Sequence, residues 1–403
     1  MKTAIKQAKI LIPSVKDLKS WAVIACDQFT SEPEYWDTLK KEIGDKPSAL
    51  NVTFPEIYLK DNPEERIEKI NSTMYSYLNS GIFSELKEGF VLTVRKTPYV
   101  EKRIGLIVAV DLDEYDYKKG ERPLIRATEG TLKERIPPRL KIRKDAPIEF
   151  PHVMILIDDE KREIIEGIYE RRNQFEKIYD FTLNQGGGEL QGYFIPESEP
   201  IIKAFENLLK EERLIKKYGF NDKFIMAVGD GNHSLATAKA HWEEIKKTVG
   251  DNGEHPAKYA LAEIVNVYDE GIYFEPIYRF VSGVNVSEFK VKFLAEKGIT
   301  CTLLDVEGET ALVGGSLPES IENTDLFIKN FLDENGGEVD YVHGKENVEN
   351  LVKKTGGVAV LFDKLDKKDL FRFVSKNGAF PRKTFSMGEG VEKRYYLEGR
   401  KIK

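Results

Sequence analysis

The stretch KFIMAVGDGNHSLATAKAHWEEIKK, residues 223–247, passes from an apolar run through glycines and polar residues into an alanine-rich segment. The run of residues 224–228 is short, apolar and bounded by glycine, which predicts a buried strand. A helix is then predicted by four apolar residues that recur at helical spacing, Leu235, Ala238, Trp242 and Ile245. The predicted order is strand, tight loop, helix, and the rest of the fold is interpreted around it.

The loop has the features of an anion site. Gly229 and Gly231 permit positive φ and let another group approach the main chain. The following helix presents unpaired N–H groups and the positive end of its dipole, which together favour phosphate or carboxylate. Asp230 is a candidate ligand for a magnesium ion or a substrate amine. His233, near the helix start, is a candidate hydrogen-bond donor or general base.

Three further residues of the first turns, Asn232, Ser234 and Thr237, are candidate phosphate or substrate ligands. Thr237 lies one helical turn from His233, on the side away from the apolar stripe. A purely structural interpretation is also open, in which the glycines make a turn and Asn232 or Ser234 caps the helix.

The remaining pattern indicates an α+β fold with a mixed sheet and flanking helices. Residues 90–94, 104–110 and 152–157 are predicted strands, and residues 161–179 a long charged helix. The stretch 261–281 suggests two paired strands. We expect an N-terminal α/β region at 1–120, a motif-bearing core at 121–290 and a C-terminal α/β region at 291–403, and leave open that they pack as one unit.

Composition narrows the classes of partner. The chain has 61 Lys and Arg against 68 Asp and Glu, a formal charge of −7, so we expect no nucleic-acid partner. No segment approaches the roughly 20 apolar residues that span a bilayer, so we expect no membrane partner. The two cysteines, Cys26 and Cys301, fit no paired metal-ligand spacing and suit the reducing cytoplasm, which is the expected location.

AVGDGNHSLATA resembles the DGHHR signature of the family called domain of unknown function 1015. GLIVAVDLDEYDY, RATEGTLKERIPPR, FEPIYRFV and FPRKTF also occur in the expected order, so the resemblance covers most of the chain. The signature is similar in turn to the motif of ParB-type proteins, sulfiredoxin and the kinases of free serine. This resemblance implies a ParB/sulfiredoxin-like core and a nucleotide or phosphoryl-transfer pocket, with serine metabolism as the substrate area.

The motif departs from the family pattern at two positions. Asn232 stands where the first histidine is usual, and Ser234 where the arginine is usual, so the motif lacks the guanidinium that would bind phosphate bidentately. A basic strip at 133–144 offers replacements, with Arg135 and Arg139 as the main candidates. Pro137 and Pro138 are expected to hold part of this strip in an extended, non-helical form.

Other candidates lie outside the motif. In RATEGT, Arg126 is a candidate substrate ligand, and Glu129 is the first choice for a general base toward a substrate hydroxyl. Arg382 and Lys383, which follow Pro381, are further anion-binding candidates. Each has a structural alternative, because basic strand edges and exposed loop acids are common.

These observations favour a phosphoryl-transfer enzyme, kinase-like or phosphatase-like, acting on a small anionic metabolite, with serine or phosphoserine as the first candidate substrate. The expected cofactors are magnesium, bound at Asp230, and a nucleotide. A non-catalytic nucleotide-binding switch is the alternative, and a homo-oligomer is left open.

Overall fold

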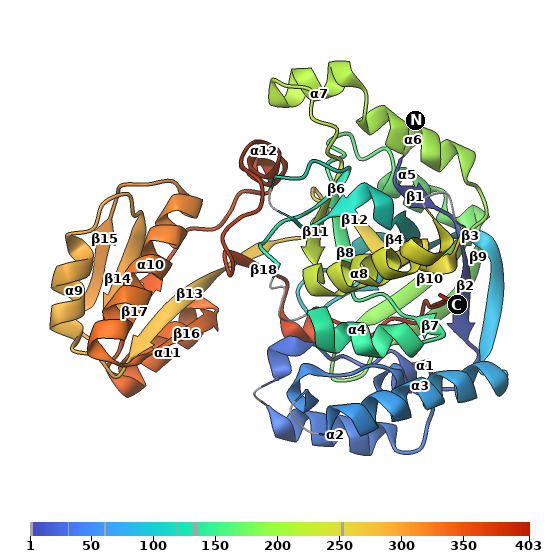
Figure 1. The fold of residues 1–403 in the computed structure, drawn as a ribbon, viewed down its shortest axis with the longest axis horizontal. Helices are drawn as coiled ribbons and strands as arrows, with labels where there is room; N and C mark the ends of the chain where they lie inside the picture. The colour runs from blue at the N-terminus through green and yellow to red at the C-terminus, as the bar shows by residue number, and fades with distance from the viewer. Residues whose placement is uncertain (1–2, 31, 60–61, 119, 132–135, 251–253) are drawn as a thin grey trace. The chain divides into compact units, whose positions relative to one another are not determined.

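The structure, a computed structural model, describes residues 3–30, 32–59, 62–118, 120–131, 136–250 and 254–403. The chain divides into two compact units (Figure 1). Unit 1 comprises Met1–Ile272 and Glu389–Lys403, and unit 2 comprises Tyr273–Gly388. The expected region 1–120 and the part of region 121–290 up to Ile272 therefore belong to one unit, and the closing segment returns to unit 1 after unit 2.

Unit 1 is built on a mixed sheet. Its strand order is β5-β6-β11-β8-β12-β4-β3-β10-β9, with β1 paired to β4 and β2 to β3. The pairs β5–β6, β6–β11 and β8–β12 are parallel and the others antiparallel, which confirms the predicted fold class. The strands are β1 Ile5–Lys6, β2 Ala8–Pro13, β3 Phe83–Lys96, β4 Arg103–Asp111, β5 Tyr115–Asp116, β6 Ile125–Ala127, β8 Met154–Ile157, β9 Glu176–Thr182, β10 Glu189–Ile195, β11 Met226–Asp230 and β12 Tyr259–Asn266.

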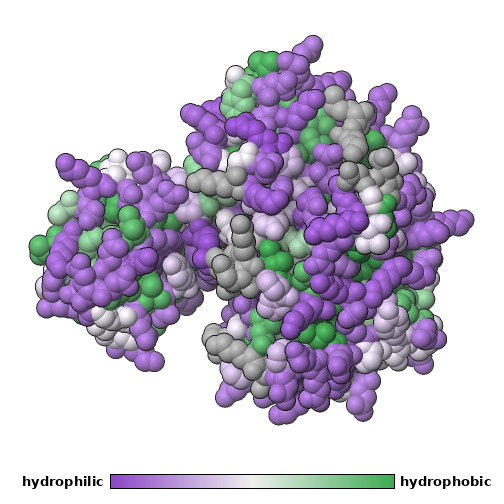
Figure 2. Space-filling model, in the orientation of Figure 1, coloured by the Kyte–Doolittle hydropathy of each residue, from purple (hydrophilic) through white to green (hydrophobic). Residues whose placement is uncertain are grey.

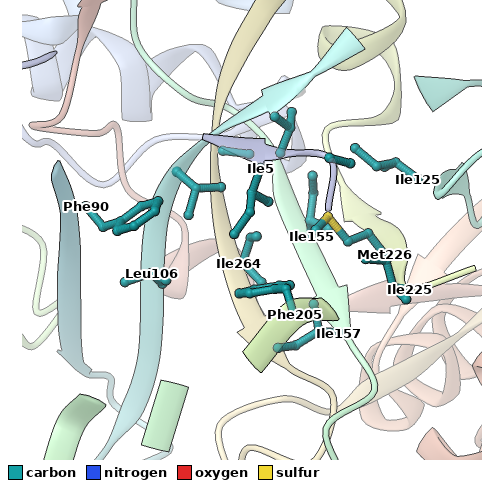
Figure 3. Close-up of a cluster of buried hydrophobic side chains, with 14 of the residues drawn as sticks. Ile5, Phe90, Leu106, Ile125, Ile155, Ile157, Phe205, Ile225, Met226 and Ile264 are labelled. Atoms are coloured by element: carbon teal, nitrogen blue, oxygen red, sulfur yellow. The ribbon is translucent and has the colours of Figure 1, made fainter. Parts of the chain in front are cut away.

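Helices cover both faces of this sheet because its central strands alternate apolar side chains between the two sides. One face, which includes Phe90, Leu106 and Ile264, packs against α5, α6 and α8 (Figure 3). The other face, which includes Val91 and Ile107, packs against α1 to α3 and the closing segment. The helices of unit 1 are α1 Leu18–Trp21, α2 Pro33–Ile43, α3 Pro63–Asn79, α4 Ile136–Asp145, α5 Ile165–Glu170, α6 Glu199–Leu208, α7 Glu211–Tyr218 and α8 Asn232–Val249.

Two short strands, β7 Ile148–Glu149 and β19 Arg400–Lys401, pair with each other and hold the closing segment against unit 1. Arg400 Nε donates to Glu149 Oε1 over 2.6 Å, and both side chains are buried. Arg394 forms a second buried ion pair, with Glu398. The closing segment is thus an integral part of unit 1.

Unit 2 is a smaller antiparallel sheet in the order β15-β14-β17-β13-β16, with β18 paired to β13. Phenylalanines of α9 and α10 pack on one face, and valines of α11 pack on the other. Its elements are β13 Phe274–Ser282, α9 Val286–Leu294, β14 Cys301–Asp305, β15 Gly308–Leu312, α10 Leu317–Asn335, β16 Glu338–His343, α11 Lys345–Thr355, β17 Val358–Leu361, α12 Lys367–Asn377 and β18 Phe385–Met387.

Three expectations about elements are wrong. The proline-containing strip is helix α4, because Pro137 and Pro138 fall in the first turn, where a helix needs no amide donor. The predicted helix at 161–179 is only the short α5, and Glu176–Thr182 is the edge strand β9, whose exposed residues carry charges. β12 and β13 were expected to pair, yet they belong to different sheets.

The surface is predominantly polar. On the face shown in Figure 2, hydrophilic residues dominate and hydrophobic ones form scattered areas. Among the described residues, no helix combines the length and apolarity needed to cross a membrane.

Candidate functional site

The site begins where β11 ends. Gly231 has φ +83° and is the N-cap of α8, and a Cβ on it would lie 1.9 Å from the carbonyl oxygen of His152. Only glycine fits this conformation and this close approach. The predicted strand and helix are thereby confirmed, with the strand shifted two residues towards the helix.

No side chain caps α8, so the alternative in which Asn232 or Ser234 caps the helix is wrong. The first intrahelical bond is donated by Leu235 N to Gly231 O, which leaves the amides of residues 232–234 outside the helical ladder. Asn232 Oδ1 is also enclosed without a hydrogen-bond partner. The first turn of α8 therefore combines N–H groups that lie outside the helical ladder with an unsatisfied acceptor, Asn232 Oδ1.

A pocket of about 180 Å³ lies against this turn. Helix α4 lies alongside α8 (Figure 1), and the two helices supply part of the lining. The polar lining residues include Ser234, Thr237, Arg139, Glu149 and His152, and the remainder are mostly apolar. Thr237 is buried and its hydroxyl donates to the carbonyl of His233 over 2.7 Å. One residue of the first turn of α8, Ser234, thus lines the same pocket as Arg139 and Thr237.

Arg139 faces two carboxyl groups as well as the pocket. Its Nη2 lies 3.9 Å from Asp27 Oδ2 and 3.7 Å from Glu56 Oε2. Loss of solvent raises the pKa of Asp27 to about 6, together with the charge of Glu56 and a hydrogen bond to it. The Asp27 side chain nevertheless keeps 63% of its exposure, so the neighbouring carboxyl of Glu56 is the main physical cause of the raised pKa.

Asp230 is paired with a lysine of the closing segment. Lys393 Nζ lies 2.9 Å from Asp230 Oδ2, and Asp230 Oδ1 accepts from Gly231 N over 2.8 Å. Burial opposes the charge of Lys393, but the carboxylate of Asp230 outweighs it and raises the pKa of the lysine. The ammonium group therefore stays charged at neutral pH.

This donor set does not fit the magnesium ion expected at Asp230. Both carboxylate oxygens are engaged, and a protein site for Mg²⁺ needs free oxygen ligands. Across the part of the chain that the structure describes, no three His, Cys, Asp or Glu side chains gather to hold a metal ion. We therefore assign no step to a metal.

Two neighbours of the site are neutral at physiological pH. Burial lowers the pKa of His152 to about 4, against the attraction of Asp230. Burial also raises the pKa of the Cys26 thiol to about 11, although Lys393 opposes this shift. His152 therefore offers a neutral imidazole to the pocket, and Cys26 is not poised as a thiolate nucleophile.

The fold brings Glu129 to the same edge of the sheet as Asp230. β6 and β11 are parallel, with Ala127 opposite Val228, and Glu129 follows β6 by two residues. The hydroxyl of Thr128 donates to the carbonyl of Val228 over 2.6 Å and joins the two strand ends. Gly229, near the end of β11, lies beside this junction.

Arg126, another predicted ligand, has a partner within unit 1. The guanidinium of Arg126 is buried and donates to both oxygens of Asp222 over 2.6 Å, so its charge is already matched within unit 1. Arg382 and Lys383 belong to unit 2, where their carbonyls accept from Arg279. Arg135 lies outside the described residues.

The site also contains residues that the sequence analysis missed, namely Asp27, Glu56, His152 and Lys393. Asp27 follows the short apolar run WAVIA, residues 21–25, and this change from apolar to acidic could have drawn attention to it. No local pattern marks the other three, because each comes from a different segment of the chain.

Comparison with known proteins identifies the family of the chain. The family model described as "Protein of unknown function (DUF1015)" matches residues 9–367, and the chain belongs to this family. A comparison with curated proteins finds no match.

Several solved structures resemble the chain at low sequence identity. A conserved hypothetical protein from Pyrococcus furiosus is 12% identical, with a TM-score of 0.35, over 70% of this chain and 90% of that one. A free serine kinase in complex with AMP is 11% identical, with a TM-score of 0.39, over 74% and 91%. SbnI with a C-terminal truncation, from Staphylococcus aureus, is 10% identical, with a TM-score of 0.37, over 70% and 82%.

Proposed function

We propose that unit 1 is an enzyme that transfers a phosphoryl group to or from a small metabolite. The observation that carries this proposal is that Ser234, in the uncapped first turn of α8, and Arg139 line the same pocket. Helix N-terminal amides attract anions, and arginine binds phosphate with two parallel hydrogen bonds. Arg139 thereby supplies the cationic group that the motif itself lacks at Ser234.

The size of the pocket favours a small ligand. Pockets that bury drug-sized molecules measure roughly 300–1,000 Å³, whereas this one measures about 180 Å³. A small metabolite suits the enclosed volume, and a nucleotide would have to extend beyond it. Serine and phosphoserine are the first compounds to test, because a phosphate complements Arg139 and an amine complements the carboxyls of Asp27 and Glu56.

Phosphoryl transfer requires mainly positioning and neutralisation of charge. In this proposal the amides of residues 232–234 and Arg139 hold the phosphoryl oxygens. When the phosphoryl group leaves the metabolite, the protonated carboxyl of Asp27 donates its proton to the departing oxygen, since a general acid works best with a pKa near the operating pH. Glu129 and His233, the acid–base groups predicted from the sequence, are the alternatives that mutagenesis has to separate from Asp27.

The test combines binding with turnover. Thermal shift with phosphate, serine, phosphoserine, ADP and ATP, each with and without magnesium, identifies the ligand class. ³¹P NMR then follows transfer between any nucleotide and any metabolite that bind. Turnover that depends on Arg139 and Asp27 supports the proposal. Stabilisation by a nucleotide without turnover favours the binding switch, and no stabilisation by any anion contradicts an anion site.

A further inference from the structure

Arg139, which lines the pocket, also lies close to the carboxyls of Asp27 and Glu56. Asp27 lies in the turn after α1, Glu56 in the turn Glu56–Tyr58, and Arg139 in the second turn of α4. The two carboxyls lie within hydrogen-bonding reach of each other, a bond that forms when one of them carries a proton, and Arg139 lies within 4 Å of both. Among the described residues, other charged or titratable groups near Asp27 include Asp230 of β11, the adjacent Cys26, and Lys393 and Tyr395 of the closing segment.

These surroundings make Arg139 the principal cation of the pair. Lys393 is already matched by Asp230 over 2.9 Å. Cys26 is a neutral thiol, and burial raises the pKa of Tyr395 well above its usual value, so neither carries charge at neutral pH. The proton affinity of the Asp27–Glu56 pair therefore depends mainly on whether Arg139 is available to it.

An anion in the pocket competes for Arg139. An opposite charge within about 4–6 Å lowers the pKa of a carboxyl by roughly 1–3 units. A sulfate or phosphate group that takes the guanidinium withdraws this attraction and adds its own negative charge nearby. Both effects favour a proton on the carboxyl pair, and neither acts on a carboxyl that Arg139 does not face.

We infer that binding of an anion to Arg139 is coupled to uptake of a proton by the Asp27–Glu56 pair. The inference rests on the anion pocket of the proposed function and adds a regulatory property to it. By linkage, the site binds anions more tightly as pH falls through the neutral range, since the protonated pair no longer competes for Arg139. Asp27 is thus a proton-exchanging residue of the binding step itself.

The number of protons taken up at pH 7 can be calculated. With Asp27 titrating at about 6 in the free protein, about a tenth of the protein is protonated at pH 7. A rise of roughly 1–3 units makes that fraction about one half to nearly one. Binding of one anion at pH 7 should therefore take up about 0.4 to 0.9 of a proton.

Isothermal titration calorimetry of the full chain with sulfate tests this coupling. Sulfate does not titrate near pH 7, so any proton that the protein takes up on binding sulfate is supplied by the buffer. Titrations in buffers of different ionisation enthalpy give the proton number as the slope of binding enthalpy against buffer enthalpy. The expected slope corresponds to about 0.4 to 0.9 of a proton per sulfate for the wild type.

Two variants complete the test. Asp27→Asn should bind sulfate with no proton uptake at pH 7. Glu64→Gln is the matched control, because exposed Glu64 pairs over 3.5 Å with Lys141, which is on α4 like Arg139. This variant should leave the proton number unchanged. Sulfate binding without proton uptake in the wild type, or equal uptake in Asp27→Asn, overturns the inference alone. Absence of sulfate binding overturns the anion pocket and the proposed function with it.

Discussion

Replacing Gly231 by alanine tests the geometry on which the site depends. Gly231 has φ +83°, and an alanine in this left-handed region costs about 1–2 kcal/mol. Its Cβ would also lie 1.9 Å from the carbonyl oxygen of His152, so the backbone has to move by more than about 1 Å to reach an ordinary contact. Overpacking of this kind adds about 1–3 kcal/mol, which makes the expected loss of unfolding free energy about 2–5 kcal/mol.

Gly219 provides the matched control. It is the C-cap of α7 with φ +86°, and a Cβ there would meet nothing within 4 Å. Gly219→Ala therefore incurs the left-handed cost of about 1–2 kcal/mol without the clash. The difference between the two variants isolates the close approach of Gly231 to His152.

Urea denaturation followed by tryptophan fluorescence measures both variants. The three tryptophans of the chain, Trp21, Trp36 and Trp242, are buried in unit 1, so the signal follows that unit. The shift at Gly231 also displaces the first-turn amides of α8, and sulfate affinity should fall by about tenfold or more. If Gly231→Ala is no less stable than Gly219→Ala and binds sulfate normally, the reasoning about this turn is refuted.

Three further outcomes are expected. Arg139→Met should weaken sulfate binding by about 10-fold to 100-fold, since a hydrogen bond to a charged group contributes about 1.5–3 kcal/mol; Lys141→Met on the same helix should not, and equal losses in calorimetry would contradict the site. Arg126→Met should lower the unfolding free energy by up to about 3–5 kcal/mol, because buried Asp222 then loses its bidentate partner and keeps the more distant Arg122, at 3.8 Å, and adding Asp222→Leu should restore most of it in the same denaturation assay. His152 titrates at about 4 when folded against about 6.5 unfolded, so the unfolded state binds more protons between these values and the histidine's contribution is lost as pH falls from 6.5 to 4. His152→Gln should remove up to roughly 3 kcal/mol of this pH dependence, and wild-type and variant curves that stay parallel over this range would argue against it.

The strand, loop and helix around Gly231 could be predicted because their signals are local. Apolar spacing changes from a short run to a helical stripe, and the glycines mark the turn. The extended form predicted at Pro137 and Pro138 is wrong because the energetic cost of a proline depends on its position in a helix, which composition does not give. The sequence of strand β9 does not distinguish a strand from a helix, because charged residues such as Glu176, Lys177 and Asp180 suit an exposed edge strand as well as a helix.

The candidate site was predictable in part for the same reason. Arg139 stood out in a concentrated basic strip, and Gly231 in a glycine-rich turn. Asp27 and Lys393 reach the site only through the fold: Ala25 N donates to the carbonyl of Lys393, and Ile24 forms a bridge with Arg394. Such contacts join segments from opposite ends of the chain, so neither propensity nor spacing could reveal them.

The return of the chain to unit 1 after unit 2 has a consequence for biosynthesis. Unit 2 is continuous in sequence, so all of it leaves the ribosome before the segment Glu389–Lys403 that carries Lys393. A nascent chain can thus hold a finished unit 2 while unit 1 still lacks the ammonium partner of Asp230. Ile402, which lines the pocket, and Lys393 are thus synthesised only after the whole of unit 2.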